Sequence, residues 1–316
     1  MIELSIIIVY YKCPDLLQSC LKSVYAETKN LEFEIIVVDN HSLDNAQDMI
    51  LHEFSHVNWI EMNYNSGFSR ANNVGIINSK GKYILLLNPD TVILNNAIEK
   101  TFLKFSELPS EYAMIGCKLL NSDNSVQKSV YYYNASYLEC ILDNIFISKL
   151  LSGSKKDKPP DKIKSIMGSF MMFRRYAANE CGLFDPDFFL YAEEIEWCSR
   201  FLKNNYKIYF FDEAAILHLK NNVPDIRMTK QRNISQALLF LKIRGKLSIF
   251  ILFTLQLLNF LSILLIYPFV NTTPKQIKIK YYLNYFSLTN EYIKIMFKYN
   301  NRMGTGNKLL KYKLIK

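Results

Sequence analysis

The stretch Leu4-Ser5-Ile6-Ile7-Ile8-Val9-Tyr10, close to the N-terminus, decides the fold class. A run of apolar residues this long, without polar alternation, is typical of a strand that is buried on both faces, as in a parallel sheet. Pro14 and Asp15 follow, and they predict the start of an amphipathic helix that runs to about residue 25. Residues 33–38 repeat the strand pattern, and Ser42 is a suitable N-cap for a helix to about residue 54. The chain therefore begins with two strand–helix units.

The alternation of strands and helices continues along the chain. The next expected elements are a strand over 58–62, a loop and helix over 67–77, and a strand over 83–87. This order predicts an α/β domain with a mostly parallel central sheet and helices on both faces. Later expected elements are a surface loop or flap over 152–164, a strand over 166–173, a helix over 192–204, a strand over 207–211 and a helix over 235–244.

Composition excludes several classes of protein. The chain has 316 residues, 50% of them apolar, with 21 Tyr and 21 Phe. Disordered chains contain few aromatic residues, so this composition indicates a folded protein. The six cysteines are scattered, without a C-x-x-C pair or a Cys/His cluster of the kind that binds structural zinc. Strand-like sequence begins almost at the first residue, without a secretory signal, so we expect reduced, cytosolic thiols.

Charge divides the chain into two parts. Residues 1–219 hold 21 Lys and Arg against 27 Asp and Glu, whereas residues 220–316 hold 17 against 2. The second part also contains residues 247–274, a run without a charged residue or a histidine. A basic segment with an apolar run favours a membrane over nucleic acid as its partner. We therefore expect a catalytic domain over 1–235 and a helical, membrane-associated tail over 236–316.

The placement of the tail in a membrane stays open at this stage. The most apolar part of the run, residues 247–270, exceeds the 20 or so residues that span a bilayer. A spanning helix, an in-plane helix and a buried core helix are all compatible with the sequence. Weakly polar residues share one side of the helical wheel, which favours the in-plane alternative: Ser248, Gln256, Asn259 and Ser262.

Two aspartates stand where predicted strands end. Asp39 ends Val37-Val38-Asp39, and Asp90 ends Leu86-Leu87-Asn88-Pro89-Asp90. The carboxyl ends of parallel strands meet at one edge of an open α/β sheet, where ligands bind, so we expect both carboxylates at one site. Each aspartate taken alone could equally be a helix cap or a turn former.

Five sequence blocks, in this order, resemble glycosyltransferase family 2, whose members share the GT-A fold. The resemblance covers roughly residues 4–220 and, within the family, points to rhamnosyltransferase-like enzymes of cell-surface polysaccharide assembly. It implies a GT-A-type α/β domain and sugar transfer from a nucleotide sugar with inversion of the anomeric carbon. The blocks are residues 5–10, 37–44, 65–75, 87–90 and 182–200.

The resemblance implies a donor site at the strand ends. Asp39 would accept a hydrogen bond from the ring N–H of uracil or thymine. Asp90 matches the last acid of the family's D-x-D motif and would bind Mg²⁺ or Mn²⁺, with Asn88 in place of the first acid. A histidine at the place of His218 can complete the metal site, although a lone histidine there is also a common core residue. The other implied nucleotide-sugar-binding residues are Tyr10, Asn40, Asn65, Gly67, Phe68, Arg70, Asn73 and Asn88.

The resemblance also implies an acceptor side in the last block. The family carries an acidic pair there whose second member is the catalytic base, and in this chain that member is Glu194. A solvated acidic helix N-terminus, stabilised by the helix dipole, is the alternative. Arg200 lies one helical turn from Glu196 and is expected to pair with it. Gly168, Ser169, Glu193 and Trp197 are expected on the acceptor side.

The sequence thus predicts an inverting glycosyltransferase of surface polysaccharide (O-antigen or capsule) assembly. It would move L-rhamnose from a dTDP donor, or a hexose from a UDP donor, to a lipid-linked glycan acceptor. The tail would hold it at the cytoplasmic side of the cell membrane, and no nucleic-acid partner is expected. Two alternatives remain: a nucleotidyltransferase, disfavoured because no Gly-rich phosphate motif follows the first strand, and a membrane-tethered nucleotide-sugar-binding protein without efficient catalysis.

Overall fold

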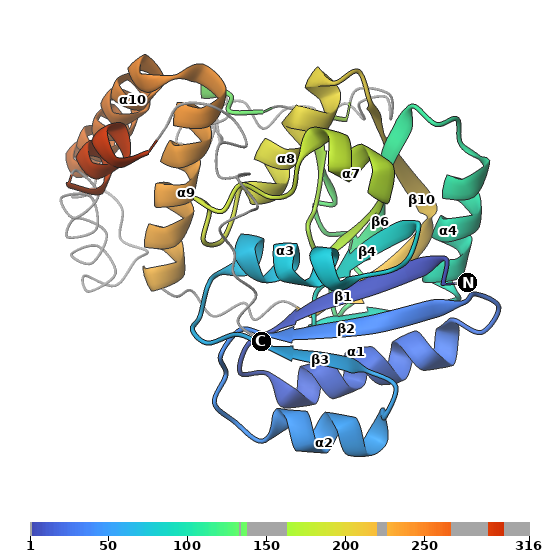
Figure 1. Cartoon of the computed structure of the whole chain (residues 1–316). Coiled ribbons are helices and arrows are strands. Elements are labelled where there is room, and N and C mark those ends of the chain that lie inside the picture. Colours follow the sequence, from blue (N-terminus) through green and yellow to red (C-terminus); the bar gives the residue numbers. More distant parts are fainter. Residues whose placement is uncertain (1, 133, 138–162, 220–225, 267–289, 300–316) are drawn as a thin grey trace.

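The computed structural model describes residues 2–132, 134–137, 163–219, 226–266 and 290–299. An eight-stranded sheet with the order β3-β2-β1-β4-β9-β6-β10-β5 forms its centre (Figure 1), and β7 pairs with β8 in a small second sheet. The strands are β1 (Leu4–Tyr10), β2 (Phe33–Asp39), β3 (Asn58–Glu61), β4 (Tyr83–Leu87), β5 (Thr91–Ile93), β6 (Tyr112–Leu120), β7 (Val130–Tyr131), β8 (Ser165–Ile166), β9 (Phe170–Arg174) and β10 (Lys207–His218).

Helices cover both faces of the large sheet. Figure 1 shows α1 and α2 beneath the β1–β3 half and α3 above it, while α8, α9 and α10 stand together on the upper side. The helices are α1 (Pro14–Glu27), α2 (Ala46–Glu53), α3 (Phe68–Asn78), α4 (Ala97–Glu107), α7 (Arg175–Cys181), α8 (Glu193–Lys203), α9 (Ile226–Arg244) and α10 (Lys246–Ile266). A further helix runs over 290–298. The α/β class expected from the sequence is confirmed.

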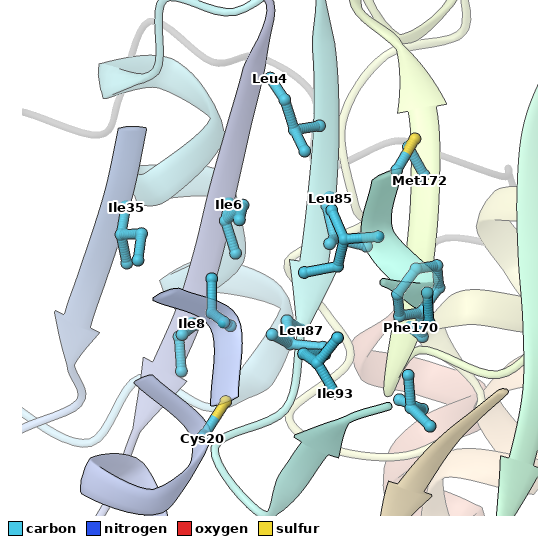
Figure 2. Packing of buried hydrophobic residues seen from close by; sticks show 14 of the residues in the cluster. Leu4, Ile6, Ile8, Cys20, Ile35, Leu85, Leu87, Ile93, Phe170 and Met172 are labelled. Carbon is cyan, nitrogen blue, oxygen red and sulfur yellow. The ribbon is translucent and has the colours of Figure 1, made fainter. Parts of the chain in front are cut away.

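Strand β1 shows why its apolar run is continuous. All seven residues are buried, and they divide between two cores by alternation. Leu4, Ile6 and Ile8 face one core, beside strand β4 in Figure 2, and residues of α1 complete it. Ile7 and Val9 face the other core, together with residues of α3. Because side chains alternate between the faces of a strand, both cores need apolar residues at consecutive positions, and the polar Ser5 is accommodated because its hydroxyl donates to Glu34 Oε1 at 2.6 Å.

The sheet is mixed: its β1–β2, β1–β4, β2–β3 and β6–β10 pairings are parallel and its other three are antiparallel, so the expected mostly parallel sheet also holds antiparallel strands. Strand β1 pairs in parallel with β2 and β4, and β3 continues that order beside β2. Strand β9, however, lies antiparallel between β4 and β6, and β5 lies antiparallel to β10. The strand–helix repeats of the sequence predict the parallel strands β1 to β4. They do not predict the antiparallel strands, because antiparallel partners need no intervening helix.

The prediction of a single strand over 166–173 is wrong. The chain forms β8 in one sheet and β9 in the other, with a turn between them. Met167 donates its backbone N–H to the Ser129 carbonyl, whereas the Ser169 carbonyl accepts from Asn88. The backbone therefore changes partners within three residues, at Gly168-Ser169, which interrupts the apolar sequence.

The C-terminal elements are longer than expected. Strand β10 continues past residue 211 to His218, with a register shift against β6, and helix α9 begins at Ile226 rather than at 235. Helix α9 therefore runs through the predicted boundary at 235, and the division into 1–235 and 236–316 stays a prediction.

Helices α9 and α10 bury a third apolar cluster with the helix over 290–298. In the part of the chain that the structure describes, no helix has the length and apolar character needed to cross a membrane. The apolar run beyond residue 266 and most of the flap expected over 152–164 lie outside the described residues.

Candidate active site

The carboxyl ends of β1, β2 and β4 form one edge of the sheet. Tyr10 at the end of β1 is in register with Asp39 at the end of β2, and Ile8 is in register with Leu87 of β4. Asn88 and Asp90 follow directly after Leu87. The two aspartates therefore lie at the same edge, as the strand pattern predicts, and this is where open α/β sheets bind ligands.

Asp39 and Tyr10 form one end of the site. Asp39 is buried, and its Oδ1 accepts a hydrogen bond from the Ser42 backbone N–H at 2.9 Å. The Tyr10 hydroxyl donates to Asp44 Oδ2 at 2.6 Å, and its ring packs against Trp59 at 5.7 Å between centroids. Burial and the neighbouring carboxylates raise the pKa of Tyr10 above its usual range, so this phenol stays neutral. Tyr10 therefore lines the site as a neutral, packed side chain.

Asn40 and Asn65 organise the loop that enters α3. Asn40 Oδ1 accepts from the backbone N–H and hydroxyl of Ser66 at 2.8 and 3.0 Å, and its Nδ2 donates to Asn65 Oδ1 at 2.9 Å. Asn65 Oδ1 also accepts from the Gly67 N–H at 3.2 Å. Both side chains expected to bind the donor therefore also set the shape of the loop around it.

Gly67 and Phe68 meet the last block of the sequence at close range. Gly67 has a φ of 83°, and a Cβ at this position would lie 2.4 Å from the Phe189 carbonyl oxygen. The Phe68 N–H donates to that same oxygen at 2.6 Å. Only glycine permits both the left-handed backbone and this approach.

Two more side chains of α3 join the same segment. Asn73 accepts from the Phe184 N–H at 3.0 Å and donates to the Phe184 carbonyl at 2.9 Å. Arg70 Nε donates to the Pro186 carbonyl at 3.0 Å. Residues 65–73 and 184–189, far apart in the sequence, therefore form one connected wall.

Asp90 and His218 lie side by side because β10 ends beside β5. His218 Nε2 is 3.5 Å from Asp90 Oδ1 and 3.4 Å from Asn88 Nδ2. On the other side of the ring, Nδ1 is 3.0 Å from Gln127 Oε1. Gln127 Nε2 donates to the His218 carbonyl at 2.7 Å, which fixes the amide with its oxygen toward the ring. That oxygen only accepts, so Nδ1 carries a proton, and in the neutral ring the nitrogen that faces Asp90, Nε2, is then free to bind a cation.

This pair fits a divalent cation. A histidine ligand whose other nitrogen is held by an acceptor is the usual arrangement in metal sites. Asp90 Oδ1 and His218 Nε2 suit Mn²⁺ or Mg²⁺ when diphosphate oxygens and water complete the coordination. Among the described residues, no cluster of three or more His, Cys, Asp or Glu side chains could hold a metal alone. Gln127 was not anticipated, because no local pattern marks a residue that acts on a partner 91 positions away.

Glu193 and Glu194 begin α8 as a buried acidic pair. Their side chains are 4% and 8% exposed, and Glu193 Oε2 has no hydrogen-bond partner among the described residues. Burial raises the pKa of Glu194 to about 7. Burial, with the charge of Glu194, raises the pKa of Glu193 well above its usual range. The alternative of a solvated acidic helix end does not hold, because both carboxyl groups are buried and burial favours their protonated forms.

Gly168 and Ser169 connect the metal-binding pair to the acidic pair. A Cβ on Gly168 would lie 3.5 Å from the Phe68 ring and 3.9 Å from Glu194 Cβ. One residue on, the Ser169 carbonyl accepts from the Asn88 N–H at 3.1 Å. The Ser169 hydroxyl is buried and has no partner among the described residues. Buried polar atoms without a partner in the described part of the chain, such as the Ser169 hydroxyl and Glu193 Oε2, are what a site for a polyhydroxylated ligand would contain.

Trp197 and Arg200 support the site from behind. Trp197 has no exposed surface, its indole N–H donates to the Gly182 carbonyl at 2.7 Å, and its ring lies 4.2 Å from that of Phe184. Because it has no exposed surface, Trp197 could support the predicted acceptor side only from behind, without touching a ligand. Arg200 Nε lies 3.0 Å from Glu196 Oε1, both buried, so the expected pairing is confirmed.

Comparison with known proteins identifies the family of the chain. The sequence profile described as "Glycosyl transferase family 2" matches residues 5–182. The chain belongs to glycosyl transferase family 2. The resemblance carried by the five sequence blocks is thereby confirmed.

Relatives in the family have described roles in glycan synthesis. The chain is 28% identical over 211 residues to "Low-salt glycan biosynthesis hexosyltransferase Agl10" of Haloferax volcanii, covering 65% of this chain and 64% of that one. It is 26% identical over 230 residues to "Rhamnosyltransferase WbbL" of Escherichia coli K12, covering 67% and 82%. It thus spans less than two thirds of the length of Agl10.

Solved structures show the same fold. "Crystal structure of S. aureus TarS 1-349" superposes with a TM-score of 0.52 at 15% identity, over 93% of this chain and 81% of that chain. "Crystal structure of GalNAc-T7 with UDP, GalNAc and Mn2+" gives 0.56 at 14% identity, over 77% and 48%. At these identities the likeness establishes a GT-A-like fold with a mixed central sheet.

Proposed function

We propose that the protein is a glycosyltransferase that moves a sugar from a nucleoside-diphosphate donor to a glycan hydroxyl, with inversion at the anomeric carbon. The observation that carries the proposal is the gathering of three features at one sheet edge in a family 2 chain. These are the buried Asp39, the Asp90–His218 pair and the buried Glu193–Glu194 pair. Each suits a different part of one reaction.

The donor would lie across the ends of β1, β2 and β4. Asp39 is suited to accept the N–H of a uracil or thymine ring, and the metal-binding pair to hold a divalent ion with the diphosphate. When bound, the ion would offset the negative charge on the leaving diphosphate. Asp90 and His218 hold that position, and Gln127 keeps the His218 ring in the required tautomer.

Glu194 is suited to act as the base. The acceptor oxygen forms a bond to the anomeric carbon while the bond from that carbon to the diphosphate breaks, and the leaving group takes the electron pair. The acceptor proton passes to a Glu194 carboxylate. A carboxylate whose pKa is near 7 is ionised in part at working pH and still basic enough to take the proton.

The sugar and acceptor are inferred from the relatives. A hexosyltransferase and a rhamnosyltransferase among them support a hexose from UDP or L-rhamnose from dTDP. We propose a lipid-linked glycan as acceptor, in surface polysaccharide assembly.

Helix α10 supports a place at the cytoplasmic face of the cell membrane. Its apolar side chains are exposed along one face, and residues 220–316 are strongly basic. An anionic lipid surface suits both properties. The exposed side chains are Leu247, Phe250, Ile251, Leu258 and Leu261.

A nucleotide panel tests the proposed function. Stability would be measured with UDP, dTDP and their sugars, with and without Mn²⁺, followed by product NMR on a lipid-linked or short glycan acceptor. A ligand at 100 times its Kd stabilises the folded state by about 2.7 kcal/mol. We expect metal-dependent stabilisation and an inverted product. No stabilisation by any nucleotide, or a product with retained configuration, would contradict the proposal.

The second candidate is a nucleotide-sugar-binding protein without efficient catalysis. The presence of Asn88 in place of an acid favours it, because one carboxylate fewer faces the metal. It predicts metal-dependent binding of the donor with neither transfer nor hydrolysis, which the same panel would reveal.

A further inference from the structure

Helix α9 contacts the segment that leads into the acidic pair. Lys242 Nζ lies 2.9 Å from Asp185 Oδ2 and 2.5 Å from Asp187 Oδ2. The side chains of Lys242 and Asp185 have no exposed surface. Asp185 Oδ1 also accepts the Asp187 N–H at 3.0 Å, so the ammonium group binds a turn that is already closed on itself.

The contact continues along the segment. The Ser235 hydroxyl donates to the Leu190 carbonyl at 2.6 Å, and Gln231 Nε2 lies 3.4 Å from the same oxygen. Phe188 has no exposed surface and is part of the apolar cluster formed by α9 and α10. Figure 1 shows α9 standing beside α8, which this segment enters.

The segment ends in strained backbone. Tyr191 and Ala192 have φ values of 72° and 68°, a region that residues with a side chain seldom adopt. Such residues persist only where the surroundings determine them. Glu193 and Glu194 come next, so the direction in which the acidic pair points depends on how this turn is held.

We propose that Lys242 is a positioning residue for the acidic pair, acting through Asp185, Asp187 and the 191–192 turn. The inference rests on the proposed function and adds that a helix from the C-terminal region is part of the catalytic unit. An ion pair between fully buried groups seldom stabilises a fold more than apolar residues of the same shape would. It does impose one geometry on the segment, which is what a base in front of an acceptor requires.

The two tryptophans of the chain allow a direct test. Trp197 lies on α8 behind the acidic pair, and Trp59 packs against Tyr10 at the Asp39 end. Full-length protein labelled with 5-fluorotryptophan should give two ¹⁹F resonances, assigned with Trp59→Phe. Lys242→Met should shift or broaden the Trp197 resonance and leave that of Trp59 in place. The control is Lys246→Met, which changes an exposed lysine four residues further on and should move neither.

Kinetics provide the second readout. In Lys242→Met we expect kcat to fall about 10- to 100-fold, because small displacements of a reacting group cost this much, while the Kd of UDP stays within about twofold. The double variant Asp185→Asn with Lys242→Met removes both fully buried charges, and it serves where the single variant does not fold. It should retain the low kcat and the altered Trp197 resonance.

The outcomes separate the two proposals. An unchanged Trp197 resonance, an unchanged kcat in Lys242→Met, or full recovery in the double variant would overturn the positioning role. If the wild-type protein transfers no sugar, the proposed function fails, and the ¹⁹F spectra still decide whether Lys242 holds the segment.

Discussion

At the level of single residues, the proposed chemistry depends on two adjacent carboxyl groups that are buried, which raises the pKa of both. The pKa of Glu194 is about 7, and that of Glu193 is also raised, by burial and by the charge of Glu194. A carboxyl group with a pKa near 7 is ionised in part at neutral pH and can then act as a base. Adjacent glutamates in a sequence do not reveal this, because it is burial by Phe68, Gly168 and the 185–192 segment that removes water.

Replacing the proposed base gives the first prediction. Glu194→Gln keeps the shape and removes the basicity, so kcat should fall by roughly 10²–10⁴ while UDP still binds. In the wild type, kcat/KM should decrease as the pH falls below about 7, since the base becomes protonated. Steady-state rates between pH 5 and 9 check both points. An active Glu194→Gln beside an inactive Glu193→Gln would assign the base to the other member of the pair.

Glu193 gives a prediction about stability. A raised pKa means that the folded state binds a proton more tightly than the unfolded state, so this group's contribution falls as the pH rises above 4.5, its usual pKa. The Glu193→Gln variant has no carboxyl group at this position, so it does not lose this contribution to stability as the pH rises. The melting temperature of the variant should exceed that of the wild type at pH 8, with a smaller difference at pH 5. Thermal melts at both values test this, and a variant less stable at pH 8 than the wild type would contradict it.

At the level of elements, the loop into α3 and the segment before α8 meet across a glycine. Gly67→Ala would bring a Cβ to 2.4 Å from the Phe189 carbonyl oxygen at a φ of 83°. We expect a loss of about 1–3 kcal/mol in the free energy of unfolding from strain and overpacking. Denaturant titration measures it.

Gly168→Ala is the matched control for that prediction. Its Cβ would meet the Phe68 ring at 3.5 Å, an ordinary contact, so the free energy of unfolding should change by less than half as much. Equal losses in the two variants would show that the close approach at Gly67 is not what makes glycine necessary.

The same elements show how far sequence alone could go. The strand ends near Asp39 and Asp90 could be predicted, because a continuous apolar run indicates a strand that is buried on both faces. The antiparallel pairing of β9 did not follow, because the apolar residues on either side of Gly168-Ser169 fit one strand as well as two. The pairing of His218 with Gln127 and of Lys242 with Asp185 depends on contacts across 91 and 57 positions, and neither leaves a periodic signal. Family motifs predicted which residues would form the candidate site. The contacts that hold those residues in place come from distant parts of the chain and could not be predicted.

At the scale of the whole molecule, the C-terminal helices have a packed face and an exposed apolar face. One face of α9 and α10 packs on the catalytic unit through Phe188 and Lys242. Apolar side chains on another part of α10 stay exposed. A protein that works on a lipid-linked acceptor needs both, because the acceptor is confined to a surface and the base must face it. The membrane contact and the active site would then be joined through one helix pair.

This arrangement leads to a prediction about lipid binding by the full chain. Vesicles that contain anionic lipid should bind the protein better than neutral vesicles, at about 1 kcal/mol per basic residue near the surface. High salt should weaken this binding without abolishing it, since burial of apolar surface contributes about 25 cal/mol per Å² independently of screening. Phe250→Asp with Leu258→Asp should reduce the bound fraction about tenfold in a flotation assay.

The control for lipid binding is another exposed leucine. Leu103 on α4 is exposed to the same degree as Leu258, 59% against 58%, and Figure 1 places α4 across the molecule from α10. Leu103→Asp should therefore leave flotation unchanged. Equal losses from the α10 and α4 variants would mean that added negative charge, rather than the apolar face of α10, governs the partition. Full-length protein that stays off anionic vesicles at low salt would remove the membrane from the proposed function, while the site at the ends of β1, β2 and β4 would stand unaffected.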